Sequence, residues 1–426
     1  MRYPMISLLC LFCLAGCSGG PGGFQPVSQD TAVFWDRQTT ETGALLREIA
    51  GDFNTTREGP PLRIERAGGY RDIYHKISAG IKARRLPSMA VAYESMTAEY
   101  AATGAAVALG PFINHPELGY TEAELDDFFP AVLETNRFPD FGGKYYSFPF
   151  SKSVLVMYFN RKLLEAAGVP GPPRTWDAFL DACRAVKAKT GKYGYAIAVD
   201  CSTVSAMVFS MGGSLLEGHQ TSYGQRPALR VFKVLETLIQ EDIAYQIPPG
   251  TFEDNIALAN DDVAFVLRTS ASLAPVARLM EGDRERWGVA PIPQADPENP
   301  ATVLFGPNVT LFDVGTPAQQ RTAWAFVKFF TSPEVNVRWA LGTGYLPIRR
   351  SAKDHPAMQR FWAEWESNRV PFECLEFARP EPNVSGWQEV RDLVERAETA
   401  VLSGTQSAED AARELKRKAD RALQRR

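Results

Sequence analysis

The chain has 426 residues, which is too many for a typical single hydrophobic core, so two or three domains are expected. Its composition, 45% hydrophobic and 23% charged, is ordinary for a globular protein, and no internal apolar run approaches the ~20 residues that cross a bilayer. The formal net charge of −4 excludes a whole-protein attraction to nucleic acid or to anionic lipid.

The first residues have the pattern of an export signal, because Arg2 supplies a small positive region and residues 5–14 form a short apolar run. The sequence LAGC that ends at Cys17 resembles a bacterial lipobox, which implies removal of residues 1–16 and a diacylglycerol on the Cys17 sulfur. An ordinary signal peptide that contains cysteines is the alternative. Residues 17–27, rich in Gly, Ser and Pro, are expected to form a flexible tether, so the mature chain would be anchored to a membrane without spanning it.

Four cysteines remain after residues 1–16 are removed: Cys17, Cys183, Cys201 and Cys374. If Cys17 carries lipid, the other three have no metal-type spacing. One disulfide with one free thiol and three buried free thiols are both compatible with this count.

The next stretch alternates between strand and helix patterns. Strands are expected at 32–35, 62–65 and 89–93, with two intervening helices whose apolar residues recur on one face. This order implies a parallel sheet with right-handed crossovers, and ligands of such sheets lie beyond the carboxyl ends of the strands. Trp35, Tyr70 and Glu94 fall at those ends.

The middle of the chain contains a strand at 154–160 that is nearly all apolar or aromatic, as a strand buried on both faces should be. A short helix at 161–167 follows it, and Thr175 is expected to cap a second helix. Beyond a strand at 195–199, residues 201–218 are interpreted as a loop.

A second buried strand ends in small hydroxyl residues near 269. Ser270 or Ser272 is expected to cap a helix over 273–281, and such a helix end suits sugar oxygens or an anion. On this stretch alone, a cap without a ligand is the better interpretation. Further strands are expected at 287–291, 303–305 and 309–312, followed by helices that begin near 316 and 332. The basic segment 416–426 is interpreted as a solvated helix end.

Two stretches carry a specific resemblance. YFNRKLL at 158–164 with PRTWDAF at 173–179, and GYLPI at 344–348, resemble the extracellular solute-binding proteins, family 1, which serve carbohydrate-type ABC importers. The order of motifs is most similar to that of the glycerol-3-phosphate- and glycerophosphodiester-binding members: FW at 34–35, SAGI at 78–81, YE at 93–94, PF at 149–150, SASLA at 270–274 and an arginine at 379.

The resemblance implies an α/β fold of two hinged lobes built from discontinuous segments, the class II type of periplasmic binding protein. By position, lobe one would be 28–152 plus 269–311, and lobe two would be 153–268 plus 312–426. The chain would then cross between the lobes near residues 152, 268 and 311.

The resemblance also implies a ligand site in the cleft. Glu94 would accept hydrogen bonds from hydroxyls, Trp35 and Tyr70 would offer flat faces, and Arg379 would hold a phosphate or carboxylate. A surface role for Glu94 and core roles for the two aromatic residues are the structural alternatives. The other expected site residues are two hydroxyl donors, a glycine that permits close approach, a tyrosine from lobe two and a lysine: Ser153, Ser270, Gly306, Tyr345 and Lys152.

The sequence departs from the glycerol phosphate receptors at two places. No tryptophan occurs between 177 and 286, where those receptors have an aromatic wall, and Lys152 replaces a small polar residue. Lys152 and Arg379 together would favour an anionic ligand, or Lys152 could pair with a nearby acid. A neutral sugar and a phosphodiester both remain open.

Enzymatic interpretations find little support. The four histidines are dispersed, and neither a G-x-S-x-G nucleophile elbow nor a Walker-type phosphate loop occurs. Adjacent acids such as Asp126-Asp127 do not supply two carboxyls facing each other ~5–9.5 Å apart, as glycoside hydrolysis needs. We therefore expect no enzyme, no metal and no cofactor.

The expected function is a monomeric, lipid-anchored receptor in the periplasm or another extracytoplasmic space. It would capture a small polyhydroxylated solute, a sugar, polyol or glycerol phosphate, and deliver it to the permease subunits of an ABC importer, with no role for nucleic acid. A secreted glycoside-active enzyme and a non-transport sensor lipoprotein on the same fold are the alternatives.

Overall fold

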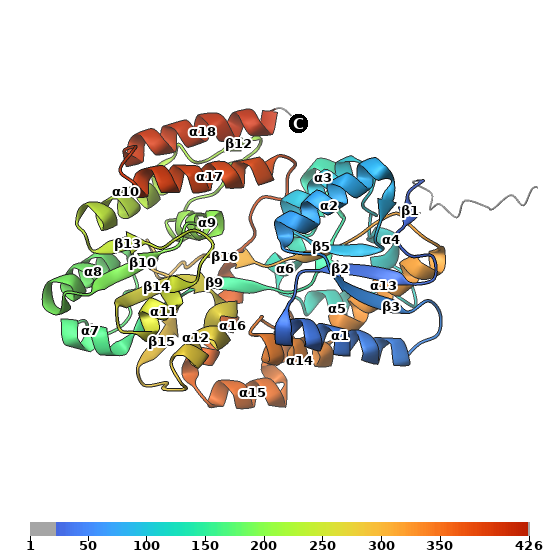
Figure 1. The fold of residues 1–426 in the computed structure, drawn as a ribbon, viewed down its shortest axis with the longest axis horizontal. Helices are drawn as coiled ribbons and strands as arrows, with labels where there is room; N and C mark the ends of the chain where they lie inside the picture. Colours follow the sequence, from blue (N-terminus) through green and yellow to red (C-terminus); the bar gives the residue numbers. More distant parts are fainter. Residues whose placement is uncertain (1–22, 425–426) are drawn as a thin grey trace, which may run out of the picture.

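The computed structural model describes residues 23–424, and its strands form two main sheets (Figure 1). The first sheet has the order β3-β2-β5-β17-β8. Its parallel strands are β2 (Ala32–Asp36), β3 (Leu62–Arg66) and β5 (Met89–Ala92), while β17 (Asn308–Leu311) runs antiparallel to β5 and to β8 (Phe148–Pro149). The helices α1 (Thr40–Thr55) and α2 (Tyr70–Ala83) connect the parallel strands, as the alternating pattern predicts.

The second sheet is built around β9 (Ser153–Asn160), whose eight residues are all buried. Its order is β13-β10-β14-β9-β16-β18, with β15 also paired to β9. The remaining strands are β10 (Tyr193–Ile197), β13 (Ala244–Gln246), β14 (Val263–Thr269), β15 (Trp287–Ala290), β16 (Thr302–Phe305) and β18 (Ala378–Arg379). The helices of this half include α7 (Arg161–Ala167), α8 (Trp176–Thr190), α10 (Arg226–Gln240), α17 (Trp387–Leu402) and α18 (Ala408–Gln424).

We call the part around the first sheet the first lobe (residues 23–150 and 307–345) and the part around the second sheet the second lobe (153–305 and 370–424). The expected assignment of 269–311 to lobe one is wrong for most of that segment, because β15 and β16 hydrogen-bond to β9. Patterns within a short segment cannot reveal this pairing, since the partner strand lies more than a hundred residues away in the sequence.

The expected assignment of 312–426 to lobe two also needs correction. Helices α13 (Pro317–Phe330) and α14 (Pro333–Thr343) pack on β2 and α1 of the first lobe, and the orange α13 lies beside the blue strands in Figure 1. The rings of Phe34 and Phe326 are 6.1 Å apart, so α13 supplies part of the core under the first sheet.

The chain crosses between the lobes at 150–152, at 305–307 and again beyond Tyr345, rather than near 268 and 311. The first two crossings touch. Gly306 has φ +102°, and a Cβ there would lie 2.0 Å from the Ser151 carbonyl oxygen, so only glycine fits. Leu346 N donates to Lys152 O at 2.8 Å, which brings the third crossing against the first. We call these three crossings the hinge.

Residues 201–218, expected to be a loop, begin with the helix α9 (Cys201–Ser210). Its N-cap Asp200 accepts a hydrogen bond from Thr203 N at 2.9 Å. Every residue of α9 is buried, so the segment has no polar face, and the usual helical periodicity of polar and apolar residues is absent from the sequence.

The expected tether is only partly within the described residues. Its end is ordered, because β1 (Gln25–Pro26) pairs with β4 (Arg85–Leu86) and Phe24 is buried, so residues 24–27 belong to the first lobe. Cys17 and the expected signal lie outside the described residues. Among residues 23–424, no helix is both long and apolar enough to cross a membrane. Cys183, Cys201 and Cys374 are free and buried, which selects the second of the two cysteine alternatives.

Candidate functional site

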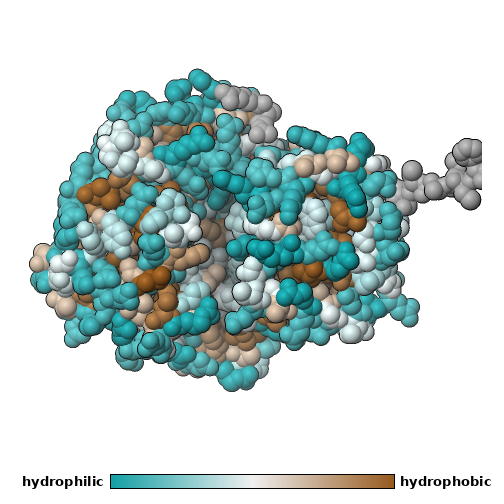
Figure 2. Space-filling model, in the orientation of Figure 1, coloured by the Kyte–Doolittle hydropathy of each residue, from teal (hydrophilic) through white to brown (hydrophobic). Residues whose placement is uncertain are grey.

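A cavity of about 810 Å³ lies between the two lobes, at the hollow that divides the molecule in Figure 2. The first lobe contributes residues that follow strands and helices there: Arg37 after β2, Tyr93 after β5, Tyr70 at the start of α2 and Tyr345 after α14. The second lobe contributes the residues beyond β10, β13 and β14. The cavity therefore lies at the carboxyl ends of the parallel strands, where α/β sheets place their ligands.

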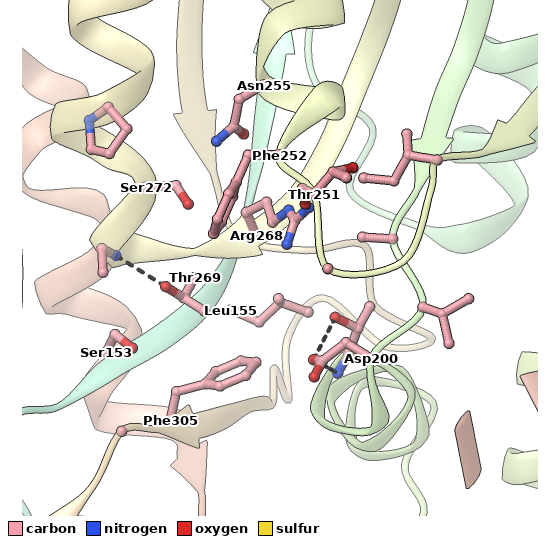
Figure 3. Close-up of a pocket in the computed structure, with 18 of the residues that line it drawn as sticks. Ser153, Leu155, Asp200, Thr251, Phe252, Asn255, Arg268, Thr269, Ser272 and Phe305 are labelled. Atoms are coloured by element: carbon pink, nitrogen blue, oxygen red, sulfur yellow. Dashed lines mark hydrogen bonds between the residues drawn. The ribbon is translucent and has the colours of Figure 1, made fainter. Parts of the chain in front are cut away.

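The wall formed by the second lobe is shown in Figure 3, and it includes the charged side chain of Arg268 near the end of β14. Asp254 accepts from Arg268 Nε at 2.5 Å and from Nη2 at 2.9 Å, and the Thr251 carbonyl accepts from Nη2 at 2.9 Å. The guanidinium carbon lies 4.9 Å from the ring centre of Phe252, which is 63% exposed at the rim of the cavity. The fully buried Asp254 neutralises Arg268, so this arginine is a fixed part of the wall.

Asn255, on α11 (Glu253–Ala259), is an unsatisfied polar group in the same wall. The residue is 2% exposed, and its Oδ1 has no hydrogen-bond partner within residues 23–424. A buried carbonyl oxygen without a partner costs free energy, so the wall holds a hydrogen-bond acceptor that the protein itself leaves unused.

Hydroxyl groups and one carboxylate complete the second lobe's contribution. Asp200 accepts from Thr203 N and from Thr203 Oγ1, and Thr269 Oγ1 accepts from Ala271 N at 3.2 Å, as the dashed lines in Figure 3 indicate. The hydroxyls of Ser153 and Ser272 also line the cavity. Ser272 stands at the expected N-cap position of α12 (Leu273–Leu279), but its side chain accepts no capping hydrogen bond, and Thr269 caps the 3-10 turn Ser270–Ser272 that precedes the helix.

The wall formed by the first lobe is a cluster of tyrosines around Arg37. The Arg37 guanidinium lies 4.7 Å from the centre of the Tyr70 ring and donates to Tyr345 Oη at 3.4 Å. The rings of Tyr70 and Tyr93 are 4.3 Å apart. Both tyrosines line the cavity, and burial raises the pKa of each well above the usual range, so these phenols stay protonated.

The structure brings four of the expected site residues to the cavity: Tyr70, Ser153, Gly306 and Tyr345. Tyr345 comes from the first lobe, not from lobe two as expected, because its hydroxyl lies beside Arg37 and Gln38 and its ring stacks on Trp339. Trp35 is half-buried away from the cavity, where its Nε1 donates to Glu65 Oε2 at 3.1 Å. Ser270 is buried and accepts from Val154 N at 3.3 Å, so it joins the turn after β14 to β9.

Glu94 and Lys152 do not line the cavity either but meet at the hinge. Lys152 is fully buried, and its Nζ lies 3.4 Å from Glu94 Oε1 and 2.9 Å from Gly306 O. Thr135 Oγ1 and Asn308 Nδ2 also donate to Glu94 Oε1. Burial lowers the pKa of Lys152, and the neighbouring Glu94 carboxylate opposes this. The alternative in which Lys152 pairs with an acid is therefore the one observed.

Arg379 was expected to bind the anionic group of the ligand, but it lies outside the cavity. Its side chain is exposed on β18, with Nη1 3.5 Å from Gly213 O and the guanidinium 5.8 Å from the Phe209 ring centre. The pairing of β18 with β16 directs it there, and a pattern in the sequence cannot show on which side of a two-residue strand a side chain lies.

Several cavity residues were missed by the sequence analysis: Arg37, Tyr93, Asp200, Asn255 and Arg268. Arg37 and Tyr93 directly follow strands, Arg268 lies next to the last residue of β14, and Asp200 lies three residues after β10. The rule that ligands lie beyond strand ends could have found these four. No local signal marks Asn255. Within residues 23–424, no cluster of three His, Cys, Asp or Glu side chains could hold a metal ion.

Comparison with known proteins gives a consistent family assignment. Residues 48–366 match the family described as bacterial extracellular solute-binding protein. A binding protein of Brucella abortus is 23% identical over 397 residues, covering 90% of this chain and 91% of that one. The sn-glycerol-3-phosphate-binding periplasmic protein UgpB of the same organism is 20% identical over 411 residues, with 91% and 92% covered.

Solved structures show the same fold. UgpB from Mycobacterium tuberculosis, in complex with glycerophosphocholine, superimposes with a TM-score of 0.80 at 18% identity and covers 93% of this chain and 99% of that chain. The cyclic alpha-maltosyl-1,6-maltose binding protein from Arthrobacter globiformis gives 0.77 at 19% identity, with 94% and 100% covered. The expected α/β fold of periplasmic solute-binding proteins is thereby confirmed, and the chain belongs to the bacterial extracellular solute-binding protein family.

Proposed function

We propose that this protein is the receptor of an ABC importer, and that it captures a small polyhydroxylated solute between its lobes and delivers it to the permease. One observation carries the proposal: the walls of a single cavity come from both lobes, Arg37 and Tyr345 on one side and Asn255 and Thr269 on the other. A solute that touches both walls binds the closed form more tightly than the open form, so binding favours closure.

The relatives support a sugar, polyol or glycerol-phosphate type of solute. Their names include a glycerol-3-phosphate-binding protein and a maltose-type binding protein, and each is called a binding protein rather than an enzyme. The cavity offers hydroxyls, an amide and aromatic rings, which are the groups that bind sugar oxygens and sugar faces. No tryptophan of the described residues lines it, so stacking would fall to tyrosine and phenylalanine.

The test begins with mass spectrometry of small molecules that co-purify with the protein. Calorimetry across sugars, polyols and glycerophosphodiesters follows. We expect one class to saturate the protein at one solute per chain and small-angle scattering to show a smaller radius of gyration with that solute. Turnover of the solute without stoichiometric binding would contradict the proposal and favour the enzymatic alternative.

Asn255→Ala sharpens this test, because it removes the unsatisfied amide from the cavity wall. The loss of one buried hydrogen bond to the solute predicts an affinity ~5- to 10-fold lower. Asn114→Ala, at an exposed position outside the cavity, is the matched control and is expected to bind as the unmodified protein does.

We also propose that Cys17 carries a lipid that anchors a monomeric receptor to a membrane in the periplasm or another extracytoplasmic space. The sequence LAGC before the described residues supports this. Cells fed a labelled fatty acid are expected to label the protein, and the Cys17→Ser variant is expected to lose the label and to leave the membrane fraction. A labelled Cys17→Ser variant would show that the lipid is attached elsewhere.

A further inference from the structure

The cavity carries more positive than negative charge, although the whole chain has a formal net charge of −4. Three arginines line it, Arg37, Arg268 and Arg278, against one carboxylate, Asp200. Asp254 neutralises Arg268 in a two-bond ion pair. Arg278 is exposed at the rim, where water solvates its charge. Among the described residues, Arg37 is therefore the cationic group of the inner cavity without a counter-charge.

The surroundings of Arg37 hold the guanidinium without neutralising it. Within residues 23–424 it forms no ion pair, and its contacts are aromatic: the Tyr70 ring at 4.7 Å and Tyr345 Oη at 3.4 Å. The adjacent Asp36 turns inward, where its Oδ2 accepts from Gln38 N at 2.6 Å and the residue is 2% exposed. Two tyrosines thus fix the position of Arg37, while most of its five N–H donors stay available to the cavity.

A half-buried guanidinium that lacks a carboxylate partner has lost part of its hydration without a compensating charge. A ligand carboxylate or phosphate would supply that charge through two parallel N–H···O bonds. A neutral sugar would supply only weaker hydrogen bonds. The geometry points to an anionic solute, a sugar or polyol that bears a carboxylate or a phosphate, with Arg37 as the residue that binds the anionic group.

This inference rests on the proposed function and assigns the anion to Arg37 in place of Arg379. The two arginines make a matched pair for the test, because Arg379 lies outside the cavity and its side chain is exposed. Arg37→Gln removes the charge and keeps an amide that can bond to Tyr345. Arg37→Lys keeps the charge but cannot form the two parallel bonds.

The experiment uses probes that differ only in the anionic group. Calorimetry compares glycerol-3-phosphate with glycerol, and glucuronate and glucose-6-phosphate with glucose. A second measurement follows the thermal unfolding midpoint in sodium phosphate against sodium chloride of equal ionic strength. We expect at least one anionic probe to bind more tightly than its neutral partner and phosphate to raise the midpoint. Arg37→Gln is expected to lower the anionic affinity ~10- to 100-fold and to abolish the effect of phosphate.

Two control variants test whether the anionic group binds specifically to Arg37. Arg379→Gln is expected to bind the anionic probe as the unmodified protein does, and Arg37→Lys is expected to fall between the two. A higher unfolding midpoint in sodium phosphate indicates a phosphate-bearing solute, whereas tighter binding of glucuronate than of glucose indicates a carboxylate-bearing solute. Circular dichroism of each variant separates loss of binding from loss of folding.

Three outcomes would overturn the inference. If neutral solutes bind and their anionic partners do not, the assignment to an anion is wrong while the receptor function stands. If an anionic probe binds equally to Arg37→Gln, the anion lies elsewhere in the cavity. If neither phosphate nor any anionic probe binds, this inference fails, and calorimetry across the wider range of sugars, polyols and glycerophosphodiesters decides the proposed function separately.

Discussion

Lys152 Nζ lies 3.4 Å from Glu94 Oε1 at the point where the chain crosses between the lobes. The lysine is fully buried, and Glu94 is the first residue of α3 (Glu94–Ala102), where a negative charge complements the positive end of the helix. Lys152 also donates to Gly306 O in a second crossing. The ion pair therefore joins the first lobe to two of the three chain crossings.

Glu94→Ala is expected to destabilise the protein strongly, because it leaves a buried lysine charge without a partner. The expected loss is ~3–5 kcal/mol in the free energy of unfolding, measured by chemical denaturation. The double variant Glu94→Ala with Lys152→Met, which removes both charges, is expected to recover most of that loss. A Glu94→Ala variant within ~1 kcal/mol of the unmodified protein would show that the pair does not stabilise the hinge.

Gly306→Ala is expected to disturb the contact between crossings. The new Cβ would lie 2.0 Å from Ser151 O, and φ is +102°, so the backbone must shift. We expect a lower unfolding midpoint together with weaker solute binding, since Gly306 also lines the cavity. Gly404→Ala is the control, because Gly404 also has a positive φ, +69°, but a Cβ added there would meet no atom within 4 Å. Equal effects of the two substitutions would contradict a special role for the hinge.

Asp36 makes stability depend on pH in a predictable direction. Burial raises its pKa from 3.8 to about 6, partly offset by a hydrogen bond from the Gln38 backbone. Because the folded protein holds the proton more tightly than the unfolded chain, this contribution to stability is fully present below pH ~4 and is lost as the pH rises through 6. The gap between the two pKa values corresponds to about 3 kcal/mol at most.

Asp36→Asn is therefore expected to unfold like the unmodified protein at pH ~4 and to be more stable at pH ~8. The measurement is the difference in unfolding free energy between the two proteins across this range. Asp30→Asn, at an exposed position, is the control for loss of a surface carboxylate. A difference that does not change with pH would mean that Asp36 is already ionised in the folded protein at the acidic end of the range.

The three described cysteines are expected to be unreactive in the folded protein. All are buried, and burial raises the pKa of Cys183, Cys201 and Cys374 above the usual range, so little nucleophilic thiolate forms. In a chain that begins at residue 23, titration with a thiol reagent is expected to detect no reactive cysteine in the folded protein and three after unfolding. Fewer than three after unfolding would reveal a disulfide.

The elements that the sequence predicted well have local causes. Thr175 caps α8 by accepting from Ala178 N at 3.2 Å, and the buried run at 154–160 becomes the central strand β9. A close approach at Gly306 was also predicted, although the approaching atom is the Ser151 carbonyl oxygen rather than only a ligand. The helix α9 was missed because its ten residues are all buried and give no alternation of polar and apolar side chains.

By itself the sequence determined the α/β alternation, the cap of α8 and the family, since these depend on neighbouring residues and on short motifs. Tertiary structure alone decided that β16 joins β9, that Lys152 neutralises Glu94 at the hinge, and that Arg37 rather than Arg379 faces the cavity. The physical reason is that strand pairing and burial join residues far apart in the chain. The charge state and the free donors of a side chain follow from those distant neighbours.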